Sequence, residues 1–529
     1  QGDLEQADVA GPLTADGRIR ARVVGRYEEG ESYIDIQHRK KWVLYGVVDA
    51  DLTDSTLVRV GISHQDTEPR GATWGSLPTF YSDGTLTDLP RSQTTAADWT
   101  YWNSTNQNIF ATIRQEFGDR WNLTVNYNRL KNTSATQLLY LYGTVDKETG
   151  TMDGTNPYKS AGESVQNSFD AQLKGLVPLF GRDHEVVLGA LHSILKRHTD
   201  NYEAPMPWLT DVPVIDQEGV PYPEPVWGTT PVRNEQERIK QTGYYGAMRL
   251  NIADPFKIIL GGRIASWEQT GYAWGTTSDY GDDNVFIPYV GALYDLTPNH
   301  RVYASYTKIF QPQNLYDRER RLLNPLDGNA YEIGLKSSFF GDALQTSVAL
   351  FRIEQDNVGQ VDGEPITVNG LTFQPYRAAQ GVVSKGFELE ATGQPMPGWN
   401  VNASYSQFKA EDADDVPANT DQPRKLLKIF TTYDLGGALT GLTIGGGVNY
   451  RSKAYSDGAN PITGAAFRFQ QDGYTLVALM ARYAVTPQLQ LQANVDNLFD
   501  KKFYSNMGSF SQYRYGAPRN FTIGATYRF

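Results

Sequence analysis

The chain has 529 residues, a formal net charge of -12, no cysteine and 12% aromatic residues. No apolar run approaches the roughly 18 to 20 residues of a membrane-spanning helix, which excludes a helical membrane protein. The acidic balance argues against a nucleic-acid partner, which would require a basic stripe, and the lack of cysteine excludes disulfides and thiolate metal sites.

Apolar residues alternate with polar ones along many short segments, and this period of two predicts β-strands. In chain order, the clearest segments are 121–128, 399–406, 488–495 and 521–529. The first reads WNLTVNYN and the last reads FTIGATYRF. The polar partners are mainly Asn, Gln, Ser and Thr, which suit a hydrated interior. The apolar rows begin or end in aromatic residues, as in the girdles of membrane barrels.

Short turns and long polar segments alternate between these strands. The short turns are expected at 14–17, 53–56, 118–121, 181–184, 253–255, 297–300, 341–343, 395–398, 436–439 and 486–488. The long segments are expected at 69–98, 133–162, 201–234, 311–327, 409–421 and 501–517. A soluble β-sandwich with one wet face also shows a period of two. A β-sandwich does not, however, require tight turns at one end of its strands and long loops at the other, whereas outer-membrane barrels have this arrangement.

These turns, with a last strand from about Pro518 to Phe529, give 21 strands. We therefore predict an all-β fold over residues 1–529, a transmembrane, antiparallel, up-and-down β-barrel of the 22-strand type. Bacterial barrels have even strand numbers because both chain ends lie on the periplasmic side, so we expect one further strand before Gln1. A lumen of that width would leak solutes, so we also expect a plug domain upstream.

Six longer segments carry a resemblance to a known family. They read SYTKIFQPQN (305–314), NPLDGNAYEIGLKS (324–337), VSKGFELEATGQPMPGWNVNASYS (383–406), DQPRKLLKIFTTYDL (421–435), VDNLFDKKFYSNMG (495–508) and YGAPRNFTIGATYRF (515–529). Together they resemble the barrel domain of TonB-dependent ferric-siderophore receptors, most closely the group for coprogen-type hydroxamates and pyoverdines.

The resemblance implies an outer-membrane receptor that imports a ferric siderophore, in contact with outer-membrane lipid. It also implies an N-terminal TonB box and plug, through which the TonB–ExbB–ExbD system supplies energy. Because this sequence carries neither, we interpret it as part of a longer receptor, with a naturally plugless barrel as the alternative. A passive, porin-like channel is the alternative from a different class. Phage or bacteriocins are also expected to bind to the outer surface of such a receptor.

An iron-uptake receptor binds an already chelated metal, so its outer loops should offer stacking rings and a few donors. The expected ligand contacts are Trp74, Trp102, Trp227, Tyr316 and Arg318, with Trp99, Tyr158, Trp208, Trp274 and Asp317 as further candidates. Trp74 and Trp227 are the first choices because each precedes a glycine in a long loop, where the backbone bends easily. Packing within the loops is the alternative interpretation for each ring.

No catalytic group and no protein-bound metal is predicted, since the iron would arrive as a chelate and no cofactor is implied. The histidines are scattered, and His192 and His198 on one strand face lie roughly 20 Å apart at ~3.3 Å per residue. The acidic run 411–415 could bind calcium or form a solvated loop. Neither a P-loop nor a GxSxG or HExxH motif occurs, so an enzyme is not expected.

The end of the chain carries a separate signal. Tyr527 and the terminal Phe529 share the apolar parity of the last predicted strand. They resemble the C-terminal assembly signal of outer-membrane proteins, so we expect them to act in membrane insertion.

Overall fold

The computed structural model describes residues 2–204, 211–214, 219–363, 366–368, 371–509 and 512–529. Within these ranges the fold is built of antiparallel strands, and the one helical element is the 3-10 turn η1 (Gly437–Leu439). None of the described helical segments is long and apolar enough to cross a membrane. The prediction of an all-β fold is confirmed.

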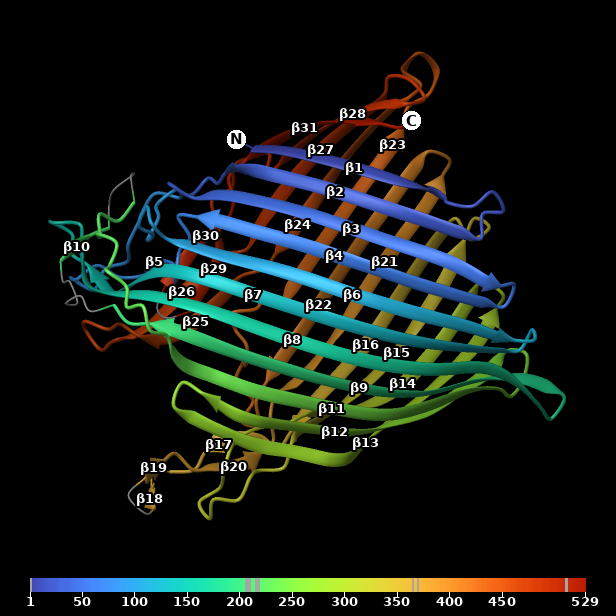
Figure 1. Cartoon of the computed structure of the whole chain (residues 1–529), viewed down its shortest axis with the longest axis horizontal. Coiled ribbons are helices and arrows are strands. Elements are labelled where there is room, and N and C mark those ends of the chain that lie inside the picture. Colours follow the sequence, from blue (N-terminus) through green and yellow to red (C-terminus); the bar gives the residue numbers. More distant parts are fainter. Residues whose placement is uncertain (1, 205–210, 215–218, 364–365, 369–370, 510–511) are drawn as a thin grey trace. The chain divides into compact units, whose positions relative to one another are not determined.

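The chain divides into two compact units, of which the first comprises residues 1–250, 260–288 and 312–325. Its long strands are β1 (Gly2–Pro12), β2 (Ile19–Glu31), β3 (His38–Thr53), β4 (Thr56–Arg70), β6 (Tyr101–Phe117), β7 (Trp121–Val145), β8 (Thr151–Leu179), β9 (Arg182–Tyr202) and β11 (Val232–Asn251). It also holds the short strands β5 (Leu77–Pro78) and β10 (Val212–Pro213), most of β12 (Phe256–Ala273) and the first half of β13 (Thr276–Thr297). From β1 to β9 the long strands run side by side, coloured blue to green in Figure 1.

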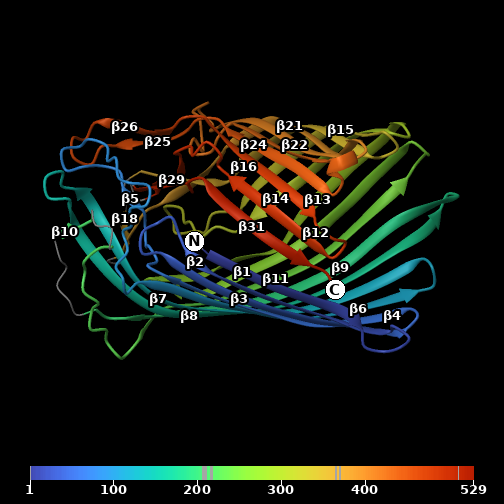
Figure 2. The same ribbon diagram turned by 90° about the horizontal axis from the view of Figure 1, so that it is seen from above.

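The second unit comprises the remaining residues. Its long strands are β14 (His300–Gln311), β15 (Leu326–Phe339), β16 (Leu344–Asp356), β21 (Val383–Met396), β22 (Trp399–Glu411), β23 (Lys425–Asp434), β24 (Leu442–Arg451), β27 (Tyr474–Ala484), β28 (Leu489–Asp496) and β31 (Asn520–Tyr527). Short two-stranded pairings lie in its connections: β17 (Val358–Val361) with β20 (Tyr376–Ala379), β18 (Ile366–Val368) with β19 (Leu371–Phe373), β25 (Ala454–Ala459) with β26 (Ala466–Gln471), and β29 (Tyr504–Ser509) with β30 (Gln512–Tyr515). The orange strands β21 to β24 lie side by side in Figure 2.

From β1 to β11 and from β13 to β31, each long strand pairs antiparallel with the next long strand, as in β6–β7, β7–β8 and β22–β23. Among the described residues, 22 strands are assigned to the large sheet. One of these, β10, is a two-residue pairing with the start of β8. That leaves the 21 long strands expected from the sequence, and each predicted short turn joins two of them.

The predicted alternation of short turns and long loops fails at one of the expected long connections, 133–162, and also between β12 and β13, where no long segment was named. Residues 133–162 do not form a loop: they extend β7 and β8 and leave a connection of residues 146–150. β12 and β13 are joined by Trp274 and Gly275 alone. The extended hairpin persists because its apolar residues, such as Leu139 and Leu141, are fully buried by neighbouring loops. These residues form strands because neighbouring loops bury their apolar side chains. The predicted pattern of short turns and long loops did not take such burial into account.

The two faces of the long strands differ in chemistry. One face, which we call the apolar face, exposes large apolar side chains such as Leu188 and Leu350. The other, the polar face, carries hydrogen-bonded amides and ion pairs, such as Asn128 to Asn108 at 2.7 Å and Arg59 to Asp49 at 2.7 Å. A soluble sheet would bury its apolar face, so an exposed one is typical of a wall that contacts lipid.

One aromatic residue of the apolar face is fitted closely to a glycine on the neighbouring strand. Trp121, at the start of β7, pairs directly with Gly175 of β8. Its indole lies across that glycine so closely that a Cβ there would overlap the ring. A glycine inside a strand often marks such a close approach.

Candidate ligand-binding site

The β7–β8 hairpin is the frame of the candidate site in the first unit. Beyond Gln137, where pairing with β6 ends, the edge of β7 is lined by the segment that follows β4. Trp74 forms a β-bridge with Tyr140, and Tyr81 forms one with Val145. The loop therefore covers a strand edge whose backbone groups would otherwise be unpaired, and this bridge fixes the position of Trp74.

Four aromatic residues, which we call the Trp74 cluster, gather on this part of the hairpin. The Trp74 ring lies 5.5 Å from that of Tyr140 and 4.8 Å from that of Tyr158, centroid to centroid. The ring of Trp274, from the turn between β12 and β13, lies 6.3 Å from Tyr158. Tyr140 and Tyr158 have the parity of Asn122 and Asn128, so they belong to the polar face.

Leu139 and Leu141, on the opposite, apolar face of the same hairpin, belong to a small hydrophobic core. Its members are Ala97, Leu139, Leu141, Val145, Met152, Val212, Val214, Val220 and Tyr222, with Tyr81 and Trp99 packed against them. Trp99 donates a hydrogen bond from Nε1 to the carbonyl of Tyr222 at 2.8 Å. Its ring meets that of Trp227 edge-on at 6.1 Å. Trp227 thus lies in a packed cluster on the face opposite to that of Tyr140 and Tyr158.

Trp227 also has polar neighbours. The ammonium of Lys159 lies 5.8 Å from the centre of its indole and 5.2 Å from that of Tyr202. Within the described part of the chain, Nε1 of Trp227 is buried without a hydrogen-bond partner. The geometry therefore separates Trp74 and Trp227, which the sequence analysis had ranked together. Trp208 lies outside the described residues.

Trp102 is an exposed ring on β6, the strand next to the β7–β8 hairpin. It lies in β6 opposite Thr136 of β7, on the polar face, and its side chain is 46% exposed. Tyr158 in β8 pairs with Leu138, two residues further along β7. With neighbouring strands ~4.8 Å apart and an offset of two residues at ~3.3 Å each, the two residues are separated by about 12 Å. A flat ligand of that span could contact both rings.

The loop 312–325 has a turn built by Asp317. Its carboxylate accepts hydrogen bonds from the backbone amides of Glu319 and Arg321, at 3.0 and 2.8 Å, and from Nε of Arg321. The amide of Arg321 is the main reason that the pKa of Asp317 lies below its usual value. Asp317 therefore has a structural role, whereas Arg318 beside it is exposed and Tyr316 is half-buried.

A polar network that the sequence analysis missed lies on the polar face of β9, β11 and β12. Nε of Arg197 contacts Glu235 at 2.9 Å and donates to Glu237 at 2.8 Å. Gln269 donates from Nε2 to the other oxygen of Glu237 at 2.8 Å. Glu237 is buried, so these donors balance its charge. Charged residues alternate with amides at the start of β11, where Arg233, Glu235 and Glu237 flank Asn234 and Gln236. That pattern was the available signal, but the partners of the network only meet through the strand register.

The loops are further held by ion pairs outside the sheet. Lys147, in the β7–β8 connection, donates to Asp83 at 2.6 Å and to the Thr85 hydroxyl at 2.7 Å. Lys147, followed by the hydroxyl and amide of Thr85, lowers the pKa of the Asp83 carboxyl to about 2. The loop that contains Trp74 is thereby connected to the hairpin tip as well as to its edge.

Among the described residues there is no group of three or more His, Asp or Glu side chains arranged to hold a metal ion. In the acidic run 411–415, Asp412 accepts from the amides of Asp414 and Val416 at 3.0 Å. Glu411 pairs with Lys409. These carboxylates shape a turn and neutralise a neighbour.

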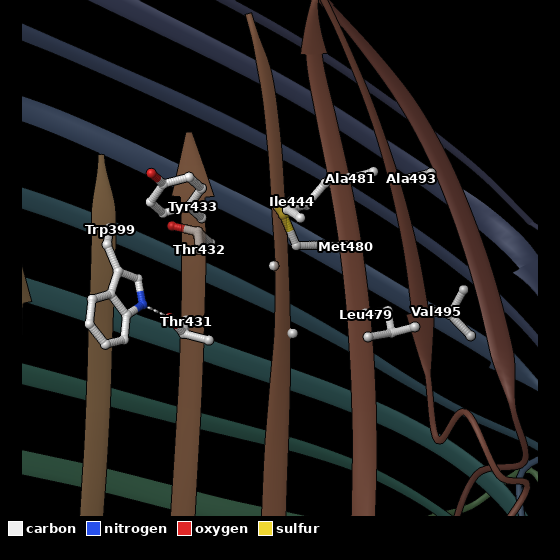
Figure 3. Close-up of a pocket in the computed structure, with 12 residues that line it drawn as sticks. Trp399, Thr431, Thr432, Tyr433, Ile444, Leu479, Met480, Ala481, Ala493 and Val495 are labelled. Atoms are coloured by element: carbon white, nitrogen blue, oxygen red, sulfur yellow. Dashed lines mark hydrogen bonds between the residues drawn. The ribbon is translucent and has the colours of Figure 1, made fainter. Parts of the chain in front are cut away.

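A hollow of about 690 Å³ lies in the second unit and not at the Trp74 cluster. Figure 3 shows Trp399, Tyr433, Leu479 and Val495 around it. These residues share the apolar face with Leu491, and Nε1 of Trp399 donates to the Thr431 hydroxyl at 2.7 Å. An apolar hollow on this face lacks the donors that would orient a polar chelate, so we do not assign it to ligand binding.

The Trp74 cluster can stack a flat or rigid ligand, and the Arg197 network, further along the same polar face, can accept and donate hydrogen bonds. Stacking and hydrogen bonding together hold a preformed chelate without removing its metal. The structure thus brings Trp74, Tyr158 and Trp274 together. It places Trp102 nearby on the same face and puts Trp99 and Trp227 on the other.

Comparison with known proteins gives a family match over most of the chain. Residues 45–498 match the family model described as TonB dependent receptor-like, beta-barrel. The ferripyoverdine receptor of Pseudomonas aeruginosa is 34% identical over 547 residues, covering 99% of this chain and 64% of that protein. The ferrioxamine B receptor of Salmonella typhimurium is 25% identical over 547 residues, covering 99% of this chain and 73% of that protein.

Solved structures agree. P. aeruginosa FpvA bound to a heterologous pyoverdine matches with a TM-score of 0.94 at 34% identity, covering 99% of this chain and 70% of that one. FpvAI in complex with pyocin S2 matches with a TM-score of 0.93 at 33% identity, covering 99% and 71%. The chain therefore spans slightly less than two thirds of the ferripyoverdine receptor, at 64% of its length.

Proposed function

Because the chain belongs to the family of TonB-dependent receptor β-barrels, we propose that it forms the wall of a transporter that imports a ferric siderophore. The protein is located in the bacterial outer membrane. The apolar face of its strands therefore meets hydrocarbon, and the polar face borders the lumen.

The observation that carries the proposal is the Trp74 cluster on the polar face. A siderophore must pass along this face, and rings held by a β-bridge are already positioned to receive it. Preorganised aromatic rings lose little conformational entropy on binding. Trp102, exposed on the same face, supplies a second surface for stacking. We propose these two tryptophans as ligand contacts, with Tyr316 and Arg318 contributing from the loop 312–325.

A hydroxamate-containing chelate is the proposed substrate class. The relatives are named as receptors for ferripyoverdine and ferrioxamine B, and the sequence resemblance indicates the same group. The ferric ion is cargo, enclosed in its chelator, so it needs no ligands from the protein. Trp227 stays a proposed contact, but its place on the apolar face of the hairpin favours a role in packing the loop 219–231.

We further propose that transport uses a plug domain and the TonB–ExbB–ExbD system, as the family membership implies. The outer loops are also proposed as a bacteriocin surface, because the structure of a relative holds pyocin S2. Catalysis forms no part of the proposed function, since the relatives are named as receptors.

The test is binding of a panel of ferric chelates to the intact receptor, purified from outer membranes. Hydroxamate-containing chelates should bind more tightly than purely catecholate ones, and each more tightly than its iron-free form. If no chelate binds while the protein passes a defined class of small solutes across a bilayer, the passive channel is the correct function. Reading the coding region upstream of Gln1 for a plug and a TonB box tests the energy coupling separately.

A further inference from the structure

A polar hollow of about 160 Å³ lies in the second unit, at the end of the strands from which its longer connections start. It is lined by the end of the β22–β23 connection, the end of β24, the start of β27 and part of β29. Arg451, Tyr474, Asp421 and Tyr504 are among the lining residues. The β25–β26 hairpin and β29 lie at this same end of the strands in Figure 2. We call this hollow the Arg451 pocket.

The strand register places Arg451 on the polar face. Arg451 is opposite Leu426 of β23, and Leu426 is opposite Ser406 of β22. Ser406 alternates with Tyr405, which has the parity of Trp399 on the apolar face. The long connections of an outer-membrane barrel are on its outer rim. Arg451 therefore borders the lumen near the rim at which a siderophore arrives.

The charge of Arg451 is not balanced by a carboxylate. The side chain is exposed, and within the part of the chain that the structure describes it forms no ion pair. Its hydrogen-bond partner is the side chain of Tyr474, which is directly opposite in the β24–β27 ladder. Asp421 lines the same pocket, but its charge acts on Arg424, a half-buried cation of the neighbouring loop. One uncompensated cation therefore remains at the pocket.

A second cation lies close to Arg451 on the same face. Lys428 of β23 is exposed, and it too has no ion pair among the residues that the structure describes. It is two residues away from Leu426, the residue opposite Arg451. The Cα atoms of Lys428 and Arg451 are thus about 8 Å apart, at ~4.8 Å between strands and ~3.3 Å per residue. An anion bound by Arg451 would also be attracted by Lys428.

The walls of the Arg451 pocket are held by contacts within the protein. Tyr474 is buried, and its ring stacks on that of Phe503 with 4.7 Å between the centroids. Gln471, at the end of β26, accepts a hydrogen bond through Oε1 from the backbone amide of Tyr504 at 2.7 Å. This bond joins β29 to the β25–β26 hairpin. A pocket that is already formed loses little conformational entropy when a ligand binds.

We propose that the Arg451 pocket binds a carboxylate that the ferric siderophore carries in addition to its iron-binding groups. The guanidinium of Arg451 can donate two parallel hydrogen bonds to a carboxylate. Because the Tyr474 oxygen accepts from Arg451, its own O–H stays free to donate a third. Lys428 adds a point charge. The inference rests on the proposed function and narrows it, since the preferred substrate becomes a hydroxamate chelate with a free carboxylate.

The size of the pocket favours an end group of the ligand over the whole chelate. Its volume of about 160 Å³ is below the roughly 300 Å³ at which pockets for whole small molecules begin. A neutral amide would fit the same space, but its NH₂ group would face the donors of Arg451 and Tyr474. Donors that lose water and gain no acceptor weaken binding. The pocket should therefore distinguish a carboxylate from an amide of the same shape.

The test uses two probes that differ only in their end group. One is ferrioxamine B with its terminal amine acylated by succinic acid, which ends in a carboxylate, and the other is the same chelate ending in the primary amide. Dissociation constants are measured by fluorescence quenching on the intact receptor purified from outer membranes. The wild type should bind the carboxylate form about 10- to 100-fold more tightly, the factor expected for hydrogen bonds to a charged group.

Arg451→Gln should bring the ratio of the two dissociation constants close to one. Its affinity for the amide form should equal that of the wild type, which shows that the variant is folded. The matched control is Arg468→Gln, which removes the same charge from a loop arginine of this unit that already pairs with Asp457 at 2.7 Å. This control should keep the wild-type preference for the carboxylate.

Three results would overturn the proposal. Equal loss of the preference in Arg451→Gln and Arg468→Gln would show that net charge alone explains it. Equal affinity of the wild type for the two probes would remove the carboxylate site and leave the proposed hydroxamate receptor intact. If the wild type bound neither probe, the proposed substrate class would fail, and the inference that rests on it would fail as well.

Discussion

The indole of Trp74 and the phenol ring of Tyr158 lie 4.8 Å apart, centroid to centroid, with their planes inclined by 46°. Trp74 comes from the loop after β4, and Tyr158 comes from β8. Their contact depends on the β-bridge between Trp74 and Tyr140, which aligns the loop with the free edge of β7. The same bridge directs the indole to the polar face, where a ligand in the lumen can reach it.

The first prediction concerns this ring. Trp74→Ala should weaken binding of the ferric siderophore up to about tenfold, because a lost aromatic contact is worth roughly 0.5 to 1.5 kcal/mol. Trp227→Ala, the matched control on the other face, should change affinity less. The affinity of the intact wild-type receptor and of each variant for the ferric siderophore is measured by fluorescence quenching. Equal affinity in the wild type and both variants would remove both tryptophans as contacts.

The second prediction concerns the buried carboxylate of Glu237. Glu237→Ala should lower the free energy of unfolding by about 1 to 2 kcal/mol, because Gln269 loses its acceptor and Arg197 loses one of two carboxylates. The figure is modest since Arg197 is partly exposed and retains Glu235. The free energy of unfolding is measured by following the folded, heat-modifiable band on a gel as temperature or urea concentration rises.

The control for that experiment is Glu116→Ala, which breaks the exposed pair between Arg114 and Glu116. Exposed pairs contribute roughly 0 to 1 kcal/mol, so this variant should unfold close to the wild type. If the two variants were destabilised equally, the network around Glu237 would contribute no more to the stability of the protein than an exposed ion pair does.

The third prediction concerns pH and the Asp83 carboxylate. Its pKa of about 2 in the folded loop lies below the ordinary value of 3.8, so protons bind more readily when the contact with Lys147 is open. The stabilising effect is complete above pH 3.8 and is lost as the pH falls through about 2. Asp83→Asn should therefore loosen the loop at pH 6, and the difference from wild type should vanish at the lowest pH.

Hydrogen exchange of the backbone amides of residues 79–87 measures that difference, with each protein compared at the same pH. Asp146→Asn offers a useful comparison, since Asp146 shapes the adjacent turn through the amides of Glu148 and Thr149 and, although it precedes Lys147 in the chain, forms no ion pair with it among the described contacts. A difference between wild type and Asp83→Asn that persisted unchanged to pH 2 would contradict the assignment.

The sequence predicted the strands and the short turns because both depend on local chemistry. Alternation along WNLTVNYN (121–128) sets the two faces of β7 without reference to any other strand. The extension of β7 and β8 was missed because the stretch QLLYLYGTV (137–145) does not alternate. It is buried on one face by loops and on the other by rings, a tertiary arrangement that a period of two does not reveal.

The site was predicted less well than the wall for the same reason. A tryptophan before a glycine marks both Trp74 and Trp227, yet one lies on the polar face and the other on the apolar face of the hairpin. The choice between faces is made by the register of the β-bridge at Tyr140, which connects residues far apart in the chain. Arg197 and Glu237 likewise meet only through the pairing of β9 with β11.

The last prediction concerns the C-terminal residue. The ring of Phe529 lies 5.4 Å from that of Tyr527 and is fully exposed, so it adds little packing to the fold. Deleting Phe529 should therefore reduce insertion into the outer membrane severalfold while the inserted fraction keeps its unfolding temperature. Phe529→Tyr, which preserves a terminal ring, should insert normally. The amount of heat-modifiable protein in the membrane fraction measures insertion, and an unchanged amount after the deletion would show that assembly does not read this residue.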